Sequence, residues 1–245
     1  MTDRYTSANS RQSEFLEDQR EIFDQLVTEE WDTYQDLNWN RSRQFEVDRL
    51  FAQVRPERVL DIGCGCGYHD LLMAVKPGVK NVLGIDYSEK SIETANRIYP
   101  HPAVKRQVAD IFSFEQNGFD LAVSFQVIEH LIDAQTFLAT NRELVRPGGW
   151  VAAVTPNRQR ALNRIFALMG RPIRLSDPQH FREYTVDELR ELGARVGLKF
   201  QGSFGYGMSI PIPLLRRSLI FAPWALRLGY GVPSLADCIC AIFRR

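Results

Sequence analysis

The stretch Val59-Leu60-Asp61-Ile62-Gly63-Cys64-Gly65-Cys66-Gly67 decides the fold of this chain. A short apolar run contains one acidic residue and opens into three alternating glycines, and residues 68–75 then have a composition compatible with a helix. Glycine adopts a left-handed backbone without strain and lets a ligand approach the main chain closely. The stretch therefore predicts a buried strand, a tight turn and a helix start, which together form a site for a nucleotide-like ligand.

The glycine spacing and the acidic residue before it indicate which of two kinds of nucleotide-like ligand, a dinucleotide or a positively charged nucleoside, the site binds. Dinucleotide sites favour Gly-x-Gly-x-x-Gly, in which helix N–H groups face a pyrophosphate. Here the spacing is Gly-x-Gly-x-Gly, and Asp61 would repel a pyrophosphate but attract a cation. S-adenosylmethionine carries a sulfonium and an ammonium group, so it fits better than NAD. An NAD-dependent oxidoreductase is also disfavoured because no Tyr-x₃-Lys pair follows the fourth predicted strand.

Length, charge and cysteine content narrow the class of protein. At 245 residues, of which 44% are apolar, the chain can form one domain with a sizeable core. Lys plus Arg and Asp plus Glu both number 30, and this balance predicts a small-molecule partner rather than nucleic acid. The four cysteines form two Cys-x-Cys pairs, a spacing that is poor for disulfides, and the N-terminus is polar. These features predict a cytoplasmic protein with reduced thiols.

Strand and helix signals alternate from Arg58 onward. Helices are predicted to start at Ser88, at Asp133 and at the Thr185–Glu188 capping box. Repeated strand–helix units of this length imply a mostly parallel sheet with helices on both faces. The predicted strands are 58–62, 81–86, 104–108, 119–124 and 150–155, followed by two final strands at 198–204 and 235–243.

Other segments lie outside this alternation. Helices are predicted at 11–34 and 41–54, before the first strand, so the chain divides into an N-terminal helical addition (1–55) and a cofactor-binding core (56–155). Residues 156–184 and 205–234 are predicted to be insertions on the substrate side of the same domain, 1–245. The apolar stretch 210–233 is broken by arginines and prolines and is too short to span a bilayer. A lid, a homodimer patch and peripheral membrane contact remain open for it.

Polar residues recur where the predicted parallel strands end. The carboxyl ends of such strands meet at one edge of the sheet, where ligands bind. A carboxylate at the second strand end can accept hydrogen bonds from ribose hydroxyls, and an acid–isoleucine pair at the third can hold adenine. The predicted cofactor-binding residues are Asp61, Gly63, Cys64, Gly65, Asp86, Tyr87, Asp110, Ile111 and Gln126.

The order of these motifs resembles the class I S-adenosylmethionine-dependent methyltransferases, in particular the small-molecule O-methyltransferases of the ubiquinone-biosynthesis type. The resemblance covers residues 58–155. It implies a Rossmann-like seven-stranded sheet, with Asp61 and the glycine loop on the methionine portion, Asp86 on the ribose and Asp110-Ile111 on the adenine. The motifs are Asp61-x-Gly-x-Gly-x-Gly, Gly84-Ile-Asp86, Ala109-Asp110-Ile111, Gln126-Val-Ile-Glu129-His130 and Leu144-Val-Arg-Pro-Gly-Gly149.

The resemblance implies methyl transfer to a small-molecule acceptor, with a hydroxyl as the expected target. An N- or C-methyltransferase and a non-catalytic nucleotide-binding subunit of a partner are the alternatives. Aromatic residues in the predicted substrate-side insertions, such as Phe181 and Tyr206, favour an acceptor that is apolar or carries a ring. A hydroxyl acceptor requires a base. His180, in the segment expected to overhang the pocket, is the first candidate, and His130 is the second, because imidazole titrates at about pH 6.5.

No metal site is expected from the strand ends. Metal-dependent catechol methyltransferases place Asp and Asn ligands at the fourth and fifth strand ends. This chain has Gln126, Glu129 and Asn157 there, which do not reproduce that set.

Overall fold

The structure is a computed structural model that describes residues 21, 24–25, 37–208 and 223–245, with the backbone alone described at 37–39 and 223–226. The predicted helix at 11–34 lies almost wholly outside these residues, as does most of the 210–233 stretch. No helix in the described ranges combines the length and the apolar character that crossing a membrane requires.

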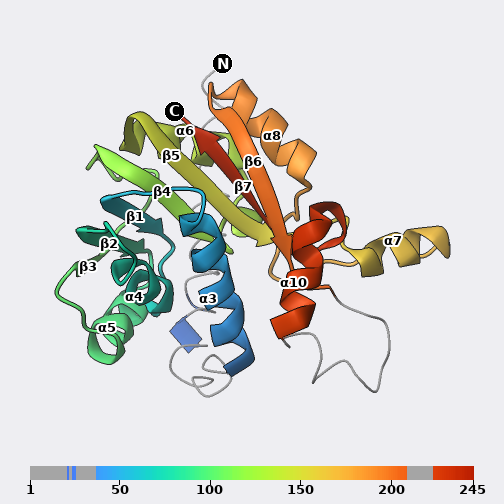
Figure 1. The fold of residues 1–245 in the computed structure, drawn as a ribbon, viewed down its shortest axis with the longest axis horizontal. Helices are drawn as coiled ribbons and strands as arrows, with labels where there is room; N and C mark the ends of the chain where they lie inside the picture. The colour runs from blue at the N-terminus through green and yellow to red at the C-terminus, as the bar shows by residue number, and fades with distance from the viewer. Residues whose placement is uncertain (1–20, 22–23, 26–36, 209–222) are drawn as a thin grey trace.

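One seven-stranded sheet forms the centre of the domain (Figure 1). The strand order is β3-β2-β1-β4-β5-β7-β6. Strands β1 to β5 are parallel, whereas β7 is antiparallel to both β5 and β6. This confirms the predicted fold class. The strands are β1 Arg58–Ile62, β2 Asn81–Asp86, β3 Val104–Val108, β4 Phe119–Phe125, β5 Val145–Pro156, β6 Lys199–Tyr206 and β7 Cys238–Arg244.

The helices begin where the sequence places capping residues. The Ser88 and Asp133 side chains accept hydrogen bonds from backbone N–H groups three residues later, and Thr185 and Glu188 form the predicted capping box. The helices are α3 Leu37–Phe51, α4 Tyr68–Ala74, α5 Glu89–Ile98, α6 Ala134–Leu144, α7 Ala161–Leu168, α8 Val186–Arg195 and α10 Pro223–Gly231. Two single 3₁₀ turns are η1 Ile128–His130 and η2 Pro233–Leu235.

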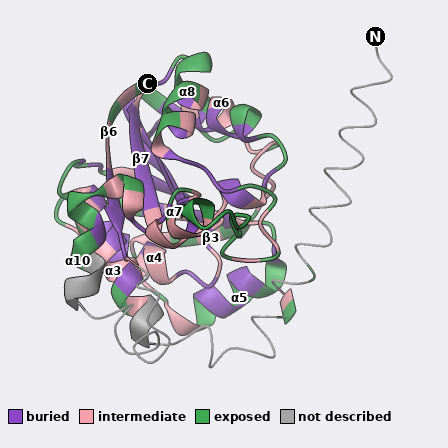
Figure 2. Cartoon of the chain, turned by 90° about the vertical axis from the view of Figure 1, so that its right-hand side faces the viewer, coloured by how far each residue is buried: buried purple, intermediate pink, exposed green. Residues whose placement is uncertain are grey.

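The sheet is covered on both faces, so its central strands are buried while the outer helix surfaces are exposed (Figure 2). On one face, α6 and α8 pack on the sheet through Phe137, Leu189 and their neighbours. On the other, α3 and α4 contribute Leu50 and Met73 to a second apolar cluster. Alternate residues of the central strands β1 and β4 therefore pack into different clusters, which explains the nearly continuous apolar runs of these two strands.

Several element boundaries differ from the sequence-based predictions, at α3, β4, β5, β6 and β7. Helix α3 begins at Leu37 rather than at 41, and β7 begins at Cys238 because Pro233–Leu235 forms the η2 turn. Strand β5 begins at Val145, which pairs with Phe119, and its register then shifts across residues 146–149 before Trp150 pairs with Leu121. The Pro147-Gly148-Gly149 sequence therefore forms an irregularity within the strand. Helix α7, in the 156–184 segment, extends away from the sheet (Figure 1).

Candidate active site

The glycine loop lies between the end of β1 and the start of α4. Gly63, Gly65 and Gly67 all have left-handed backbone, with φ of 71°, 50° and 78°. The N–H groups of Gly63 and Cys64 donate to the Ile85 carbonyl at 2.8 and 3.0 Å. A Cβ on Gly63 would lie 2.5 Å from Val127 Cγ2. The loop therefore requires glycine at position 63 for two reasons: the backbone is left-handed there, and a side chain would clash with Val127.

The carboxylate of Asp86, at the end of β2, connects the glycine loop to α5. Its Oδ2 accepts a hydrogen bond from Gly65 N–H, and its Oδ1 accepts one from Ser88 N–H, both at 2.8 Å. Burial raises the pKa of Asp86, although these two N–H groups act in the opposite direction. The Ser88 hydroxyl donates to Asp24, so one residue of the N-terminal segment lies against this strand end. The neighbouring Tyr87 is 37% exposed.

A group of buried charges lies beneath the glycine loop. Asp70, on α4, pairs with Arg106 of β3 at 2.7 Å, and the two side chains are 0% and 1% exposed. Arg106 also donates to the Gly67 carbonyl at 3.2 Å. A Cβ on Gly84 would lie 2.6 Å from Asp70 Oδ2, so the absence of a side chain there makes room for the pair. Sequence reasoning gave neither Asp70 nor Arg106 a role.

Asp61 is fully buried beside this pair. Neither of its carboxylate oxygens accepts a hydrogen bond from a donor in the described part of the chain. Burial first, and then the adjacent Asp70 carboxyl, raise the pKa of Asp61 well above its usual value. In its protonated form Asp61 is hydrogen-bonded to Asp70. A buried carboxyl with a pKa raised in this way favours its protonated form until a donor or a positive charge is brought beside it.

The third and fourth strand ends carry the remaining predicted cofactor residues. Asp110 Oδ1 accepts a hydrogen bond from Phe112 N–H at 2.9 Å, and Ile111 packs against the core. Gln126 has φ of 59° and is the one non-glycine residue with positive φ in the described ranges. Its amide donates to the Tyr206 hydroxyl at 3.4 Å. Such backbone strain is concentrated at functional sites.

Three distant segments meet near Gln126 in a contact that the sequence did not indicate. The Tyr206 hydroxyl donates to Glu46 of α3, whose other oxygen lies 2.8 Å from His69 Nε2. The His69 ring stacks on Phe125, with centroids 3.9 Å apart. No periodic pattern relates these residues, because they come from α3, α4 and β6. Tyr206 is thus a packed core residue with a satisfied hydroxyl, whereas Phe181 is 53% exposed.

The two candidate bases lie side by side, His130 in the η1 turn after β4 and His180 in the segment after β5. The His130 and His180 ring centroids are 4.8 Å apart, and the rings are nearly perpendicular. Burial, then the nearby His180, lowers the pKa of His130 to about 4, so His130 is neutral at pH 7. Glu129 lies close to both rings and accepts a hydrogen bond from Thr155 of β5; it is fully buried, and that burial raises its pKa to about 7. Sequence reasoning identified both histidines but gave Glu129 no role.

Glu183 positions His180. Its Oε1 lies 3.2 Å from His180 Nδ1, and its Oε2 pairs with Arg160. Burial raises the pKa of Glu183, but hydrogen bonds with His180, Ser176 and Arg160 outweigh it and hold the value at about 2. Glu183 is therefore a carboxylate at neutral pH and favours a His180 tautomer that carries its proton on Nδ1.

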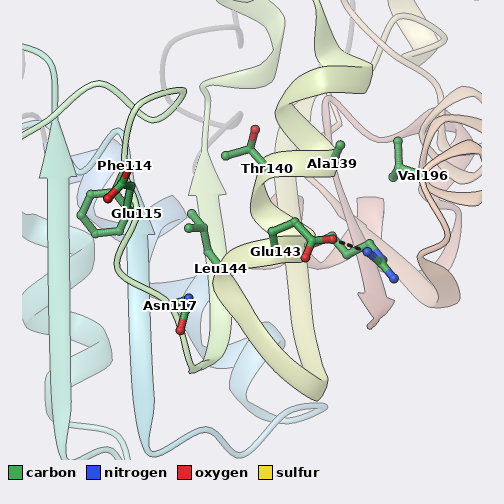
Figure 3. A pocket seen from close by; sticks show the side chains of 9 residues that line it. Phe114, Glu115, Asn117, Ala139, Thr140, Glu143, Leu144 and Val196 are labelled. Carbon is green, nitrogen blue, oxygen red and sulfur yellow. Dashed lines mark hydrogen bonds and ion pairs between the residues drawn. The ribbon is translucent and has the colours of Figure 1, made fainter.

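A hollow of about 550 Å³ lies elsewhere on the domain (Figure 3). It is formed by α6, by the connection before β4 and by Val196, and Leu144 at its floor directly precedes β5. It thus lies near the amino ends of β4 and β5, and none of the predicted site residues lines it. In open parallel sheets ligands bind at the opposite, carboxyl ends.

Comparison with known proteins identifies the family. The sequence model of the methyltransferase domain family matches residues 40–201. A probable S-adenosylmethionine-dependent methyltransferase of Mycolicibacterium smegmatis is 30% identical over 200 residues, which cover 76% of this chain and 74% of that protein. A ubiquinone biosynthesis O-methyltransferase of Chromobacterium violaceum is also 30% identical, over 76% of this chain and 84% of its own length.

The fold agrees with a solved structure of the same class. The N-methyltransferase NodS of Bradyrhizobium japonicum, in complex with S-adenosylhomocysteine, superposes with a TM-score of 0.60 at 17% identity, over 92% of this chain and 97% of NodS. The chain therefore belongs to the methyltransferase domain family and is an enzyme that uses S-adenosylmethionine as its methyl donor.

Proposed function

We propose that this enzyme transfers the methyl group of S-adenosylmethionine to a hydroxyl oxygen of a small-molecule acceptor. The observation that carries the proposal is the group formed by Glu129, His130 and His180, because a hydroxyl must lose a proton on methylation and this group can take one up. The similarity to ubiquinone biosynthesis O-methyltransferases supports the same reaction.

The cofactor side of the proposal rests on the strand ends of β1 to β3. The buried carboxylate of Asp61 would bind the ammonium group of the cofactor. This group carries N–H hydrogen-bond donors, and no described residue donates a hydrogen bond to Asp61. The backbone of Gly63, Cys64 and Gly65 would lie along the methionine portion. The Cys64 side chain is itself buried against the position of Gly84. The bound cofactor supplies an electrophilic methyl group on a sulfonium, a good leaving group.

The remaining predicted residues would hold the nucleoside. Asp86 would accept hydrogen bonds from the ribose hydroxyls, and the partly exposed Tyr87 would lie beside them. Asp110 and Ile111 would face the adenine, and Gln126 would lie between cofactor and acceptor at the end of β4. Alignment of donor and acceptor in a water-poor site can contribute roughly 7–11 kcal/mol to such a displacement, so these residues have little covalent chemistry to perform.

On the acceptor side, we propose that the hydroxyl lies against Glu129, His130 and His180. Glu129 has a pKa of about 7, which suits a group that accepts a proton at neutral pH. The exposed Phe181 ring follows His180 directly and favours an acceptor with an apolar or aromatic part. An amine acceptor would not need this proton-accepting group to the same extent, since a neutral amine is already nucleophilic.

A methyl-transfer assay with matched acceptors tests the proposal. Phenols, catechols and quinols are compared with the corresponding anilines, using labelled S-adenosylmethionine. We expect methylation at oxygen. The His180→Ala substitution should lower turnover by a factor of about 10²–10⁴ and leave the Kd for S-adenosylhomocysteine within twofold. His101→Ala, in the connection before β3, is the matched control. Selective methylation of the anilines, or full turnover by His180→Ala, would contradict the proposal.

A further inference from the structure

Glu129, His130 and His180 form a converging set of potential metal ligands. One ligand atom from each residue lies within 4.8 Å of the other two. Glu129 and His130 come from the η1 turn after β4, and His180 comes from the 156–184 segment fifty residues later. The Glu129 carbonyl accepts hydrogen bonds from Phe181 and Arg182 N–H at 2.9 and 3.1 Å, which fixes the two segments against each other.

Glu129 contributes a buried oxygen that is available to a ligand. The residue is 0% exposed, and its Oε2 accepts a hydrogen bond from the Thr155 hydroxyl at 2.9 Å. Its Oε1 has no hydrogen-bond partner among the described residues. A buried carboxylate oxygen without a partner is costly, and a cation bound beside the two imidazoles would satisfy it.

His180 is oriented as metal-binding histidines are. Its Nδ1 faces Glu183 Oε1 at 3.2 Å and the Ser176 hydroxyl at 3.3 Å. Glu183 is in turn held by Arg160 and by two hydrogen bonds from Ser176. A carboxylate that accepts the Nδ1 proton leaves the lone pair of Nε2 available, and such carboxylate–histidine pairs commonly support metal ligands.

We propose that Glu129, His130 and His180 bind one divalent first-row transition-metal cation, such as Zn²⁺, Co²⁺ or Mn²⁺. Two imidazole nitrogens and one carboxylate oxygen favour these ions over Mg²⁺ and Ca²⁺, which prefer all-oxygen sites. This set differs from the strand-end Asp and Asn ligands considered in the sequence, because its third member comes from the segment after β5. It replaces the expectation of a metal-free site.

Binding of the ion does not depend on the proposed function, but its role in the reaction does. Three protein ligands leave coordination positions open, as in catalytic metal sites. An acceptor hydroxyl that occupied one of them would release its proton to solvent more readily, because a bound cation lowers the pKa of the oxygen. The three side chains would then hold the cation instead of taking up the proton themselves.

Metal binding is measured first, without cofactor or acceptor. Protein freed of metal with a chelator is titrated with Co²⁺, followed by its visible absorption, and with Zn²⁺, followed by calorimetry. We expect one ion per chain. Glu129→Gln, His130→Ala and His180→Ala should each weaken binding at least tenfold, and Glu183→Gln should weaken it by a factor of about 10–100. His101→Ala should bind as the unaltered protein does, and Mg²⁺ and Ca²⁺ should compete poorly.

Binding of S-adenosylhomocysteine shows whether each variant is folded. If folded protein takes up neither Co²⁺ nor Zn²⁺, or if the ligand variants bind as tightly as His101→Ala, the metal site is refuted. Hydroxyl methylation that proceeds at the full rate in metal-free protein would refute the ion's role in the reaction, while leaving the proposed function standing. Stoichiometric metal binding without any hydroxyl methylation would refute the proposed function and leave the metal site standing.

Discussion

The buried pair formed by Asp70 and Arg106 gives the sharpest test of how the glycine loop is held. Arg106→Met keeps most of the side-chain volume but removes the charge, leaving Asp70 buried beside Asp61 without a counter-ion. Removal of one member of a buried pair costs about 3–5 kcal/mol. For a domain of this size each kcal/mol lowers Tm by about 2–4 °C, so we expect Tm to fall by roughly 6–20 °C.

Urea unfolding followed by circular dichroism measures this loss. Arg195→Met is the matched control, because its pairing with Glu191 is exposed and 3.8 Å long and should contribute less than about 1 kcal/mol. Asp70→Asn combined with Arg106→Met should recover part of the loss, since the unpaired charge is then gone. A loss from Arg106→Met as small as that of the control would refute the reasoning.

The loss should also depend on pH with a defined sign. Burial raises the pKa of Asp70 even with Arg106 in place. Without Arg106 this pKa rises further, so the folded variant retains a proton that the unfolded chain releases. The variant's stability is therefore greatest at low pH and falls as pH rises. We expect a smaller difference from the unaltered protein at pH 5 than at pH 8, and a constant difference would contradict this account.

Three further predictions concern other residues. Asp61→Asn should weaken S-adenosylhomocysteine binding by roughly 10- to 150-fold in calorimetry, because a charged hydrogen bond is lost. The urea midpoint of the ligand-free variant should stay equal or rise, because the new amide can donate a hydrogen bond to Asp70. Unchanged affinity would show that Asp61 does not bind the cofactor. Gly63→Ala should lower the free energy of unfolding more than Gly78→Ala does. Both glycines have left-handed backbone, but only at Gly63 would the new Cβ meet a side chain, that of Val127. Adding Val127→Ala to Gly63→Ala should restore the part of the lost stability that comes from this clash, whereas equal losses at both glycines would show that backbone strain alone matters. Hydrogen bonds from Thr185 N–H and Arg182, together with the charge of Arg158, outweigh burial and lower the pKa of Glu188. The stability that the ionised Glu188 contributes is thus present above the pKa of this carboxyl in the unfolded chain and is lost as pH falls through its pKa in the folded protein. Glu188→Gln should therefore reduce the loss of stability that the unaltered protein shows on acidification. If the variant and the unaltered protein lose stability in parallel as pH falls, Glu188 makes no such contribution.

The sequence predicted the half of the site that local patterns encode. Strands β1, β2 and β3 have the predicted bounds. Strands β1 and β2 are short, largely apolar runs that are followed by a turn residue or end in an acid, and β3 begins and ends with valine shortly before Asp110. The proposed cofactor residues follow from these bounds, since a strand that ends at Asp86 places that carboxylate at the carboxyl edge of the sheet. The capping residues Ser88, Asp133 and Thr185 fix helix starts in the same local way.

The remainder depends on contacts between distant segments. Arg106 looks like an ordinary strand residue, and only the parallel register that places it beside Gly84 and over Asp70 makes it a loop anchor. The meeting of Glu129 with His180 depends on backbone hydrogen bonds between η1 and residues 181–182, which no periodicity indicates. The irregular start of β5 was missed because Pro147-Gly148-Gly149 normally interrupts a strand, whereas pairing of Val145 with Phe119 extends it.

The place of β7 has a consequence for how the chain reaches its native state. This strand follows β6 in the sequence but lies between β5 and β6 in the sheet (Figure 1), so β6 has no neighbour until β7 is inserted. During synthesis β6 emerges first and exposes an open edge with the apolar side chains of Phe200 and Phe204. Strand β7 therefore joins the sheet between two strands rather than at its edge. Unpaired strand edges of this kind promote aggregation until they are covered, so a chain in which β7 is not yet in place would be aggregation-prone.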